Sequence, residues 1–178
     1  GYTSLEEVNI NPYSFDFLGD ENNSDFNWEN CKSYILGVGS NTIRKTMALR
    51  VEKAGGKCLS IVHPNCSLAS TISIGEGTFV ARNVAINPLV QVGKNAILNT
   101  SCTIDHECII GDNVHIAPGA VLAGNVIVQD GAFIGANAVV KQGVTIGRNA
   151  TVGAGSVVLS NVEANQVVVG NPARIITI

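Results

Sequence analysis

Three titratable residues stand together in a stretch of the chain that otherwise carries almost no charge. They are Asp105, His106 and Glu107, within the sequence TIDHECIIGD. A histidine titrates near neutral pH, so it can accept a proton from an amine or a hydroxyl group. A neighbouring carboxylate can orient its ring or stabilise its charged form. The stretch is therefore a candidate acid–base site, with His106 as the base and Glu107 or Asp105 as its helper, although a solvated turn would show the same residues.

A repeat of six residues surrounds this stretch and indicates what positions it. Small or β-branched residues precede each aliphatic residue of the repeat by two positions, as Cys102 precedes Ile104. Residues two apart on a strand face the same side, so we expect both to point inward. The aliphatic residues recur without a slip at Val62, Leu68, Ile74, Val80, Ile86, Val92, Leu98, Ile104, Ile110, Ile116, Leu122, Val128, Ile134, Val140, Ile146, Val152 and Val158.

A turn slot follows each aliphatic residue by three positions. From Gly77 to Asn161, Gly or Asn fills twelve of these fifteen slots, and both residue types tolerate a left-handed turn. Each hexad is therefore a short strand plus a tight turn, and stacked hexads predict a β-solenoid. The exceptions are Leu89, Ser101 and Glu107, and a broken local rule is where function or strain is expected. This favours the catalytic interpretation of His106 over a solvated turn.

The repeat resembles the hexapeptide motif of left-handed β-helix acyltransferases, in which three hexads make one coil of triangular section. The tail Val168 to Arg174, VVGNPAR, is similar to the V-x-G-x-P-A-[KR] ending of the same superfamily. The resemblance implies a left-handed parallel β-helix with coils about 4.8 Å apart. It also implies a homotrimer, in which residues of neighbouring subunits can meet in the groove between prisms.

A narrower resemblance covers nearly the whole chain. Several short motifs are similar to those of certain sugar acyltransferases. They are HP at His63, NT at Asn99, DHEC at Asp105, and HIAPGA with LAGNV from His115 to Val126. That family includes UDP-N-acetylbacillosamine N-acetyltransferase and the sialic acid O-acetyltransferases. The resemblance implies that His106 is the general base and that Glu107 assists it.

Contacts to acetyl-CoA are also implied. The resemblance gives His115 such a contact, and a structural role at a subunit interface fits the sequence equally well. Gly124 stands one coil after His106 and has no side chain to block a thioester, so its amide is a candidate oxyanion donor. The pantetheine arm is expected to run past Ala136 and Ala154 toward Gly170, Asn171 and Pro172.

The first sixty residues have a different pattern. Strands are predicted over 15–18, 33–38 and 57–62, and a helix over 42–54 that Ser40 opens and Gly55 closes. This segment resembles the small Rossmann-like domain that holds the nucleotide sugar in the same family. There are two departures: Gly19 stands at a position where that family usually has an acidic residue, and the glycine-rich opening strand, turn and helix are absent from the sequence. We expect an α/β domain over 1–61 and the β-helix with its tail over 62–178. Substrate contacts are expected at Asp20, Gly37, Gly39 and Asn99.

Charge and cysteine content exclude several classes of function. A net charge of −3 without a run of basic residues argues against nucleic-acid binding. No stretch is apolar enough to span a membrane or to act as a signal peptide. We therefore expect a cytoplasmic protein. The five cysteines never fall as C-x-x-C, which predicts reduced thiols and no zinc ribbon. Cys102 and Cys108 fall in inward slots, so we expect direct attack on acetyl-CoA and no acyl-enzyme.

The combined expectation is an acetyl-CoA-dependent N-acetyltransferase acting on a nucleotide-linked, UDP-4-amino sugar in bacterial glycan biosynthesis. An O-acetyltransferase of the sialic acid type is the alternative. A zinc hydratase would need three converging histidines, and His63 lies four hexads or more from the other two, so no metal is expected. A non-enzymatic ice-binding or structural solenoid would need a ladder of outward threonines, which the sequence lacks.

Overall fold

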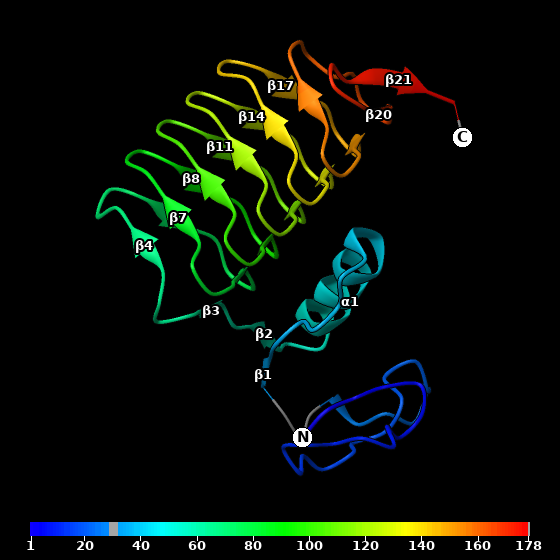
Figure 1. The fold of residues 1–178 in the computed structure, drawn as a ribbon. Helices are drawn as coiled ribbons and strands as arrows, with labels where there is room; N and C mark the ends of the chain where they lie inside the picture. Colours follow the sequence, from blue (N-terminus) through cyan, green and yellow to red (C-terminus); the bar gives the residue numbers. More distant parts are fainter. Residues whose placement is uncertain (29–31, 178) are drawn as a thin grey trace. The chain divides into compact units, whose positions relative to one another are not determined.

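The computed structural model describes residues 1–28 and 32–177 and is mainly β (Figure 1). It forms two compact units, Gly1–Lys32 and Ser33–Ile178. The second unit contains one α-helix and a parallel β-solenoid of about six coils. The predicted solenoid is thus confirmed, while its left-handed sense and the functional division at residues 61 and 62 stay predictions.

The strands of the solenoid form three sheets, which we call its faces. The six-stranded face contains β4 (Ser67–Leu68), β7 (Ala85–Ile86), β10 (Thr103–Ile104), β13 (Val121–Leu122), β16 (Val139–Val140) and β19 (Val157–Val158). The five-stranded face contains β5 (Ser73–Ile74), β8 (Gln91–Val92), β11 (Ile109–Ile110), β14 (Ile127–Val128) and β17 (Thr145–Ile146). The eight-stranded face contains β3 (Ile61–Val62), β6 (Phe79–Val80), β9 (Ile97–Leu98), β12 (His115–Ile116), β15 (Phe133–Ile134), β18 (Thr151–Val152), β20 (Val167–Val169) and β21 (Arg174–Ile176).

Each coil before the last is 18 residues long, so three hexads make one turn around the solenoid. Thr103 on β10 pairs with Val121 on β13, and His115 on β12 pairs with Phe133 on β15, both in parallel register. The same parallel pairing repeats up each face, and among the described strands only β20 with β21 is antiparallel. Equivalent positions of successive coils therefore lie directly above one another.

Corner turns join the faces. The first fourteen of the fifteen predicted turn slots, from Gly77 to Gly155, have positive φ, including the exceptions Leu89, Ser101 and Glu107. The last slot was predicted wrongly, because the final coil is two residues shorter: Val162 bridges Ile146 and Val167 pairs with Thr151. Asn161 therefore takes no left-handed turn, and the next one is at Asn165, which repeats the turn of Asn149. We name three corners after one residue of each: the Asn113 corner between the five- and eight-stranded faces, the Asn99 corner between the eight- and six-stranded faces, and the His106 corner between the six- and five-stranded faces.

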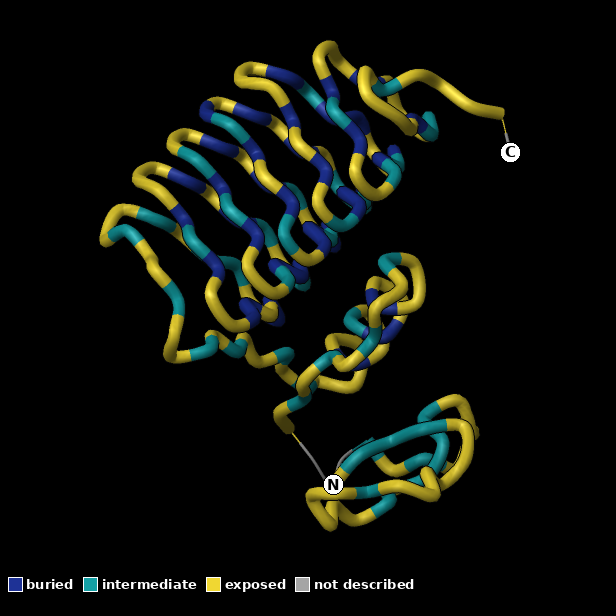
Figure 2. Tube along the Cα trace, in the orientation of Figure 1, coloured by how far each residue is buried: buried dark blue, intermediate teal, exposed yellow. Residues whose placement is uncertain are grey.

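Buried and exposed residues alternate along each coil, as the colours of the tube show (Figure 2). Ile104, Ile116 and Leu122 are fully buried in the central coils. At the first coil the same slots are open, since Val62 is 42% exposed and no coil precedes it in the chain as described. Cys102 and Cys108 are fully buried, and burial raises the pKa of Cys102 to about 12 and also raises the pKa of Cys108. Their assignment to the core is confirmed; Cys31 lies outside the described residues.

The α-helix α1 (Asn41–Lys53) begins where predicted. The side chain of Ser40 accepts a hydrogen bond from the Ile43 N–H at 3.4 Å, and Gly55 follows the helix with a φ of +74°. Two short parallel strands flank it, β1 (Ser33–Tyr34) and β2 (Lys57–Cys58). This is a single β–α–β unit, so the predicted Rossmann-like domain is not confirmed in the described residues.

Arg44 and Asn41 attach α1 to the solenoid. Arg44 is 1% exposed, and its guanidinium donates to the backbone carbonyls of Asn95 at 2.7 Å and Asn113 at 2.9 Å. The Asn41 amide donates to the carbonyl of Gly131 at 2.9 Å. These three carbonyls occupy equivalent turn positions of successive coils and accept no other backbone hydrogen bond that the structure describes. The helix therefore supplies donors that the solenoid lacks at the Asn113 corner.

The unit Gly1–Lys32 contains no strand or helix in its described residues. The N–H of Tyr2 donates to Asp16 at 2.9 Å, and the rings of Tyr2 and Phe17 lie 5.5 Å apart. The predicted strand over 15–18 is reduced to an isolated bridge between Tyr2 and Phe17. Asp20 closes a local turn, since its carboxylate accepts hydrogen bonds from the N–H and the side chain of Asn22 at 2.8 and 2.7 Å.

Candidate active site

His106 and Glu107 lie side by side in the turn between β10 and β11. The Nδ1 atom of His106 is 3.0 Å from Oε2 of Glu107, and both side chains are about half exposed. Because a carboxylate can only accept a hydrogen bond, Nδ1 must carry the ring proton in this contact. The neutral ring then has its lone pair on Nε2, which is the arrangement a general base requires.

Asp105 supports the turn and does not bind the His106 ring. Its Oδ1 atom accepts hydrogen bonds from the backbone N–H of His106 at 2.8 Å and from the Asn87 amide at 2.6 Å. These two hydrogen bonds lower the pKa of Asp105, the one from Asn87 having the larger effect, and keep the carboxylate ionised at neutral pH. The structure thereby separates the two acids that the sequence left as alternatives: Glu107 orients the ring and Asp105 orders the backbone.

Gly124 lies next to the free nitrogen of His106, one coil further along the corner. A β-carbon placed on Gly124 would lie 2.5 Å from both Nε2 and Cε1 of His106. The N–H of Gly124 has no hydrogen-bond acceptor among the described residues, while the neighbouring N–H of Asn125 donates to the His106 carbonyl at 2.8 Å. A base and an unused backbone donor therefore meet at one place, as acyl transfer requires.

Two residues of this corner were not assigned a role from the sequence. Leu89 lies one coil before Glu107 and is 55% exposed, so it places an apolar side chain beside the acid–base pair. Asn87 holds Asp105, as described above. Leu89 could have been found from the sequence, because it breaks the Gly or Asn rule of the turn slots. Asn87 could not, because nothing in the repeat distinguishes it.

His115 and Asn99 form a second polar pair, between the eight-stranded face and the Asn99 corner. Nδ2 of Asn99 is 3.2 Å from Nε2 of His115, and Oδ1 of Asn99 accepts from the Thr100 N–H at 2.8 Å. The His115 ring packs edge-on against Phe133 at 5.2 Å, and its Nδ1 atom is buried without a hydrogen-bond partner. Burial, followed by the charge of Arg44, lowers the pKa of His115, so its neutral form is favoured.

The other residues assigned to acetyl-CoA lie further along the Asn99 corner. Ala136 accepts a backbone hydrogen bond from Gly155, and the Gly170 N–H donates to the buried Ser156 hydroxyl at 3.1 Å. The tail therefore folds back beside the coil that contains Ala154. Asn171 and Pro172 are exposed directly after Gly170.

The expected site residues thus fall into separate groups. His106, Glu107 and Gly124 meet at the His106 corner. Asn99, His115 and Gly39 lie around the eight-stranded face, where the Gly39 carbonyl accepts from Arg44 at 3.2 Å, and Gly37 is exposed just before it. Within one chain the six-stranded face separates the His106 corner from the residues of the Asn99 corner, Asn99, Ala136 and Ala154. Asp20 belongs to the other compact unit.

The described part of the chain contains neither a metal centre nor a membrane-spanning helix. No group of three or more His, Cys, Asp or Glu side chains is arranged to hold a metal ion in residues 1–28 and 32–177. Over the same residues, no helix is long and apolar enough to cross a membrane.

Comparison with known proteins identifies the family of this fold. A family model described as bacterial transferase hexapeptide (six repeats) matches residues 89–124 and 125–160. No curated protein sequence matches the chain. PerB from Caulobacter crescentus, solved with CoA and GDP-perosamine, is 32% identical with a TM-score of 0.85, and the match covers 89% of this chain and 77% of PerB.

Two other solved structures are similar. The acetyltransferase domain of PglB from Neisseria gonorrhoeae FA1090 is 28% identical with a TM-score of 0.84, covering 92% of this chain and 80% of that domain. WeeI from Acinetobacter baumannii AYE is 34% identical with a TM-score of 0.80, covering 83% of this chain and 72% of WeeI. The fold and the site thus define a hexapeptide-repeat acyltransferase. The chain belongs to the bacterial hexapeptide-repeat transferase family, and it is similar to perosamine N-acetyltransferase from Caulobacter crescentus.

Proposed function

We propose that the chain transfers an acetyl group from acetyl-CoA to the amine of a nucleotide-linked amino sugar. The observation that carries this proposal is the His106–Glu107 pair, with Nε2 of His106 beside the backbone of Gly124. Similar proteins support the choice of substrates, because PerB was solved with CoA and GDP-perosamine and the PglB domain with acetyl coenzyme A. The sequence resemblance favours a UDP-4-amino sugar as the acceptor.

In the proposed reaction the amine nitrogen of the sugar attacks the thioester carbonyl. The new N–C bond forms, His106 Nε2 accepts the proton that the amine loses, and the C–S bond breaks to release CoA as its thiol. Glu107 holds Nδ1 and stabilises the imidazolium that forms. The N–H of Gly124 is positioned to stabilise the oxyanion of the intermediate. The absence of a side chain on Gly124 suits the approach of a thioester to this nitrogen.

We assign His115, Ala136, Ala154, Gly170, Asn171 and Pro172 to acetyl-CoA, and Asn99, Gly37, Gly39 and Asp20 to the nucleotide sugar. In one chain the acetyl-CoA residues and His106 lie at different corners, so the complete site would need a second subunit. Exposed apolar residues on both sides of the His106 corner, such as Ile109 and Val139, support such contacts. We therefore propose a homotrimer with the active sites between subunits.

The test is thiol release from acetyl-CoA with UDP- and GDP-linked 4-amino sugars and with free sialic acid. For the wild type we expect release with an amino sugar. His106→Ala should lower kcat by about two orders of magnitude or more, the usual contribution of a general base. His63→Ala is the matched control and should leave kcat unchanged, because His63 lies at the start of the solenoid.

Each outcome decides between functions. Unchanged turnover in His106→Ala would remove this residue from the mechanism. Release only with sialic acid would assign O-acetylation, and the absence of release with every acceptor would contradict the proposed substrates.

A further inference from the structure

A cavity of about 600 Å³ lies between the start of α1 and the Asn113 corner, apart from the His106 corner. On one side it is lined by the first turns of α1, and on the other by turns of successive coils and by the outer surface of the eight-stranded face. The residues that matter for its chemistry are Asn41, Thr42, Lys45, Asn113, Asp130 and Arg148.

The cavity has an excess of positive charge. α1 is 13 residues long and has no acidic residue in its first turn. The positive end of its dipole lies here, with the N–H groups of Asn41 and Thr42 beside the Ile43 N–H that Ser40 already caps. Lys45 forms no ion pair in the part of the chain that the structure describes. Asp130 is already engaged, because one carboxylate oxygen accepts from the Asp112 N–H at 3.0 Å and the other lies 3.3 Å from Arg148. The lysine and the helix terminus therefore remain without a counter-charge.

Arg44 adds a buried positive charge next to the residues that line this cavity. Its guanidinium donates to the Asn41 side chain and to the Asn113 carbonyl, both at 2.9 Å, and all its acceptors are uncharged. Although burial lowers the pKa of Arg44 to about 10, the group stays protonated at neutral pH. Asn41 and Asn113 both line the cavity, so this charge contributes to the field inside it.

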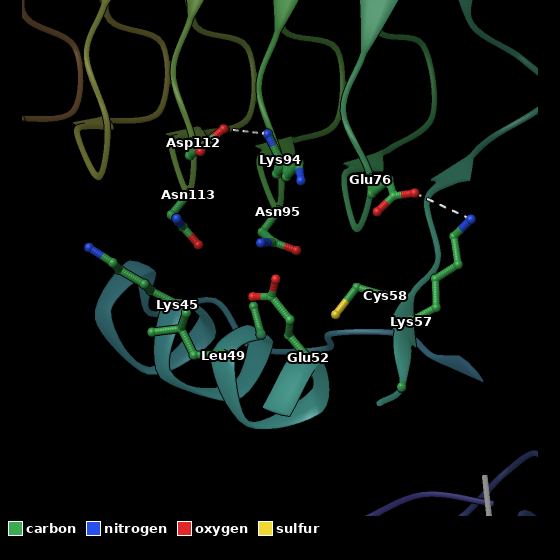
Figure 3. Close-up of a pocket in the computed structure, with 12 residues that line it drawn as sticks. Lys45, Leu49, Glu52, Lys57, Cys58, Glu76, Lys94, Asn95, Asp112 and Asn113 are labelled. Carbon is green, nitrogen blue, oxygen red and sulfur yellow. Dashed lines mark hydrogen bonds and ion pairs between the residues drawn. The ribbon is translucent and has the colours of Figure 1, made fainter. Parts of the chain in front are cut away.

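Asn113 is an independent indication of a ligand. Its side chain is buried, with only 8% of the residue exposed, yet its Oδ1 atom has no hydrogen-bond partner. A buried polar atom without a partner is costly, and a bound molecule that donates a hydrogen bond to it removes this cost. Figure 3 shows the Asn113 side chain projecting from the corner toward α1 and Lys45. A ligand must offer a hydroxyl or N–H group to satisfy this oxygen.

An adjoining cavity of about 360 Å³, drawn in Figure 3, is also lined by Lys45 and Asn113, so it is the alternative place for an anionic ligand. Its charges balance, so it offers no comparable site. The cations there are Lys45, Lys57 and Lys94, and the carboxylates are Glu52, Glu76 and Asp112.

We propose that the cavity at the start of α1 binds a phosphate ester. The phosphate lies at the N-terminus of α1 between Lys45 and Arg148, and a hydroxyl or N–H group of the same ligand donates to Oδ1 of Asn113. Two molecules carry both groups: the nucleotide part of the sugar substrate, and CoA. The naming of these two sources rests on the proposed function, whereas the phosphate chemistry does not.

The test is isothermal titration of the full chain with UDP, GDP, CoA and inorganic pyrophosphate. For the phosphate probes that bind the wild type, we expect the double variant Lys45→Ala with Arg148→Ala to bind about tenfold more weakly or worse, through loss of charge-assisted hydrogen bonds. Asn113→Gly keeps a residue suited to the left-handed turn, where Asn113 has a φ of 56°. It should weaken binding of the phosphate esters and leave pyrophosphate, which has no carbon-bound hydroxyl or N–H group, unchanged.

Matched controls separate the cavity from general effects of charge and backbone. Lys53→Ala removes a lysine from the last turn of the same helix, and Asn83→Gly changes a left-handed asparagine of an earlier coil that lines neither cavity. Both should bind every probe as the wild type does. An effect confined to CoA, or to the nucleoside diphosphates, identifies the source of the phosphate.

Equal affinities in the wild type and the double variant, or no binding of any probe by the wild type, would overturn the proposal. Thiol release tests the proposed function separately. An active enzyme with an unaffected double variant would therefore reject this cavity and retain the acetyltransferase.

Discussion

At the scale of single residues, the candidate active site depends on side chains placed where the fold prefers glycine or asparagine. Glu107 has a φ of 60° and Leu89 a φ of 64°, in the left-handed region that Asn95 and Asn125 occupy in equivalent turns. For a residue with a larger side chain this conformation costs about 1–2 kcal/mol. The strain is local, and it places the carboxylate 3.0 Å from the His106 ring. Strain of this kind is concentrated at functional sites.

Replacing Glu107 by Asn should therefore have opposite effects on stability and on activity. We expect Glu107→Asn to raise the free energy of unfolding by up to about 1 kcal/mol, because asparagine adopts the left-handed conformation more readily. It should also lower kcat, since the His106 ring loses its carboxylate partner. Urea denaturation and thiol release measure the two quantities.

Glu107→Gln is the matched control, because it removes the charge and keeps the strained long side chain. It should lower kcat without a gain in stability. If Glu107→Asn proved both more stable and fully active, Glu107 would have no catalytic role.

At the scale of elements, a polar clamp attaches α1 to the solenoid. Arg44 and Asn41 satisfy turn carbonyls of three successive coils, at Asn95, Asn113 and Gly131. Among the described residues no carboxylate pairs with the buried guanidinium, so the clamp depends on backbone carbonyls and on the Asn41 side chain. It also holds the Val38 and Gly39 carbonyls, at 3.1 and 3.2 Å from Arg44, above the eight-stranded face.

Arg44→Met should release α1 without unfolding the solenoid. The substitution leaves buried carbonyls without donors, which we expect to cost about 2 kcal/mol or more. Amide hydrogen exchange should become about thirtyfold faster or more in α1, and the central strands, such as β10 and β13, should keep their protection.

Lys53→Met, on the exposed side of the same helix, is the control and should exchange as the wild type does. Uniform loss of protection in α1 and in the strands would show that the helix and the solenoid unfold as one unit, contrary to this description.

At the scale of the whole molecule, the solenoid is a stack in which each coil contacts only its neighbours. The central coils are closed on both sides and fully buried inside, whereas the first coil leaves Leu68 36% exposed. Exposed apolar side chains also flank the His106 corner: Ile109 and Ile127 on the five-stranded face, and Val121 and Val139 on the six-stranded face. In the proposed trimer these surfaces lie between subunits.

Ile127→Glu should therefore dissociate the trimer. A charge placed in an apolar interface is costly to bury, so we expect a shift to monomer in light scattering and a loss of acetyl transfer of about tenfold or more. The far-ultraviolet circular dichroism should stay unchanged, because the side chain at this position points outward.

Ile175→Glu, the same apolar-to-charged substitution on β21 at the end of the solenoid, is the control and should keep the assembly of the wild type. A monomeric wild type with full activity would contradict the placement of the active site between subunits.

The sequence by itself determined the solenoid, its corners and the position of the candidate acid–base site at His106. Each hexad encodes one inward aliphatic residue and one left-handed turn, and both are local properties that need no knowledge of distant contacts. For the same reason Glu107 was visible as a residue that breaks the rule. Sequence reasoning failed at Asn161, because the final coil is two residues shorter, which removes Asn161 from the turn without disturbing composition.

Only the tertiary structure decided which of the two acids serves His106, and how α1 is held. Both depend on where a side chain points after the chain has closed, and stacking of coils 18 residues apart brings Asn87 to Asp105 and Gly124 to His106. The clamp at Arg44 joins residues 51 and 69 positions apart in the sequence. Such pairings carry no local signal, because their free energy comes from satisfying buried backbone groups in the folded state.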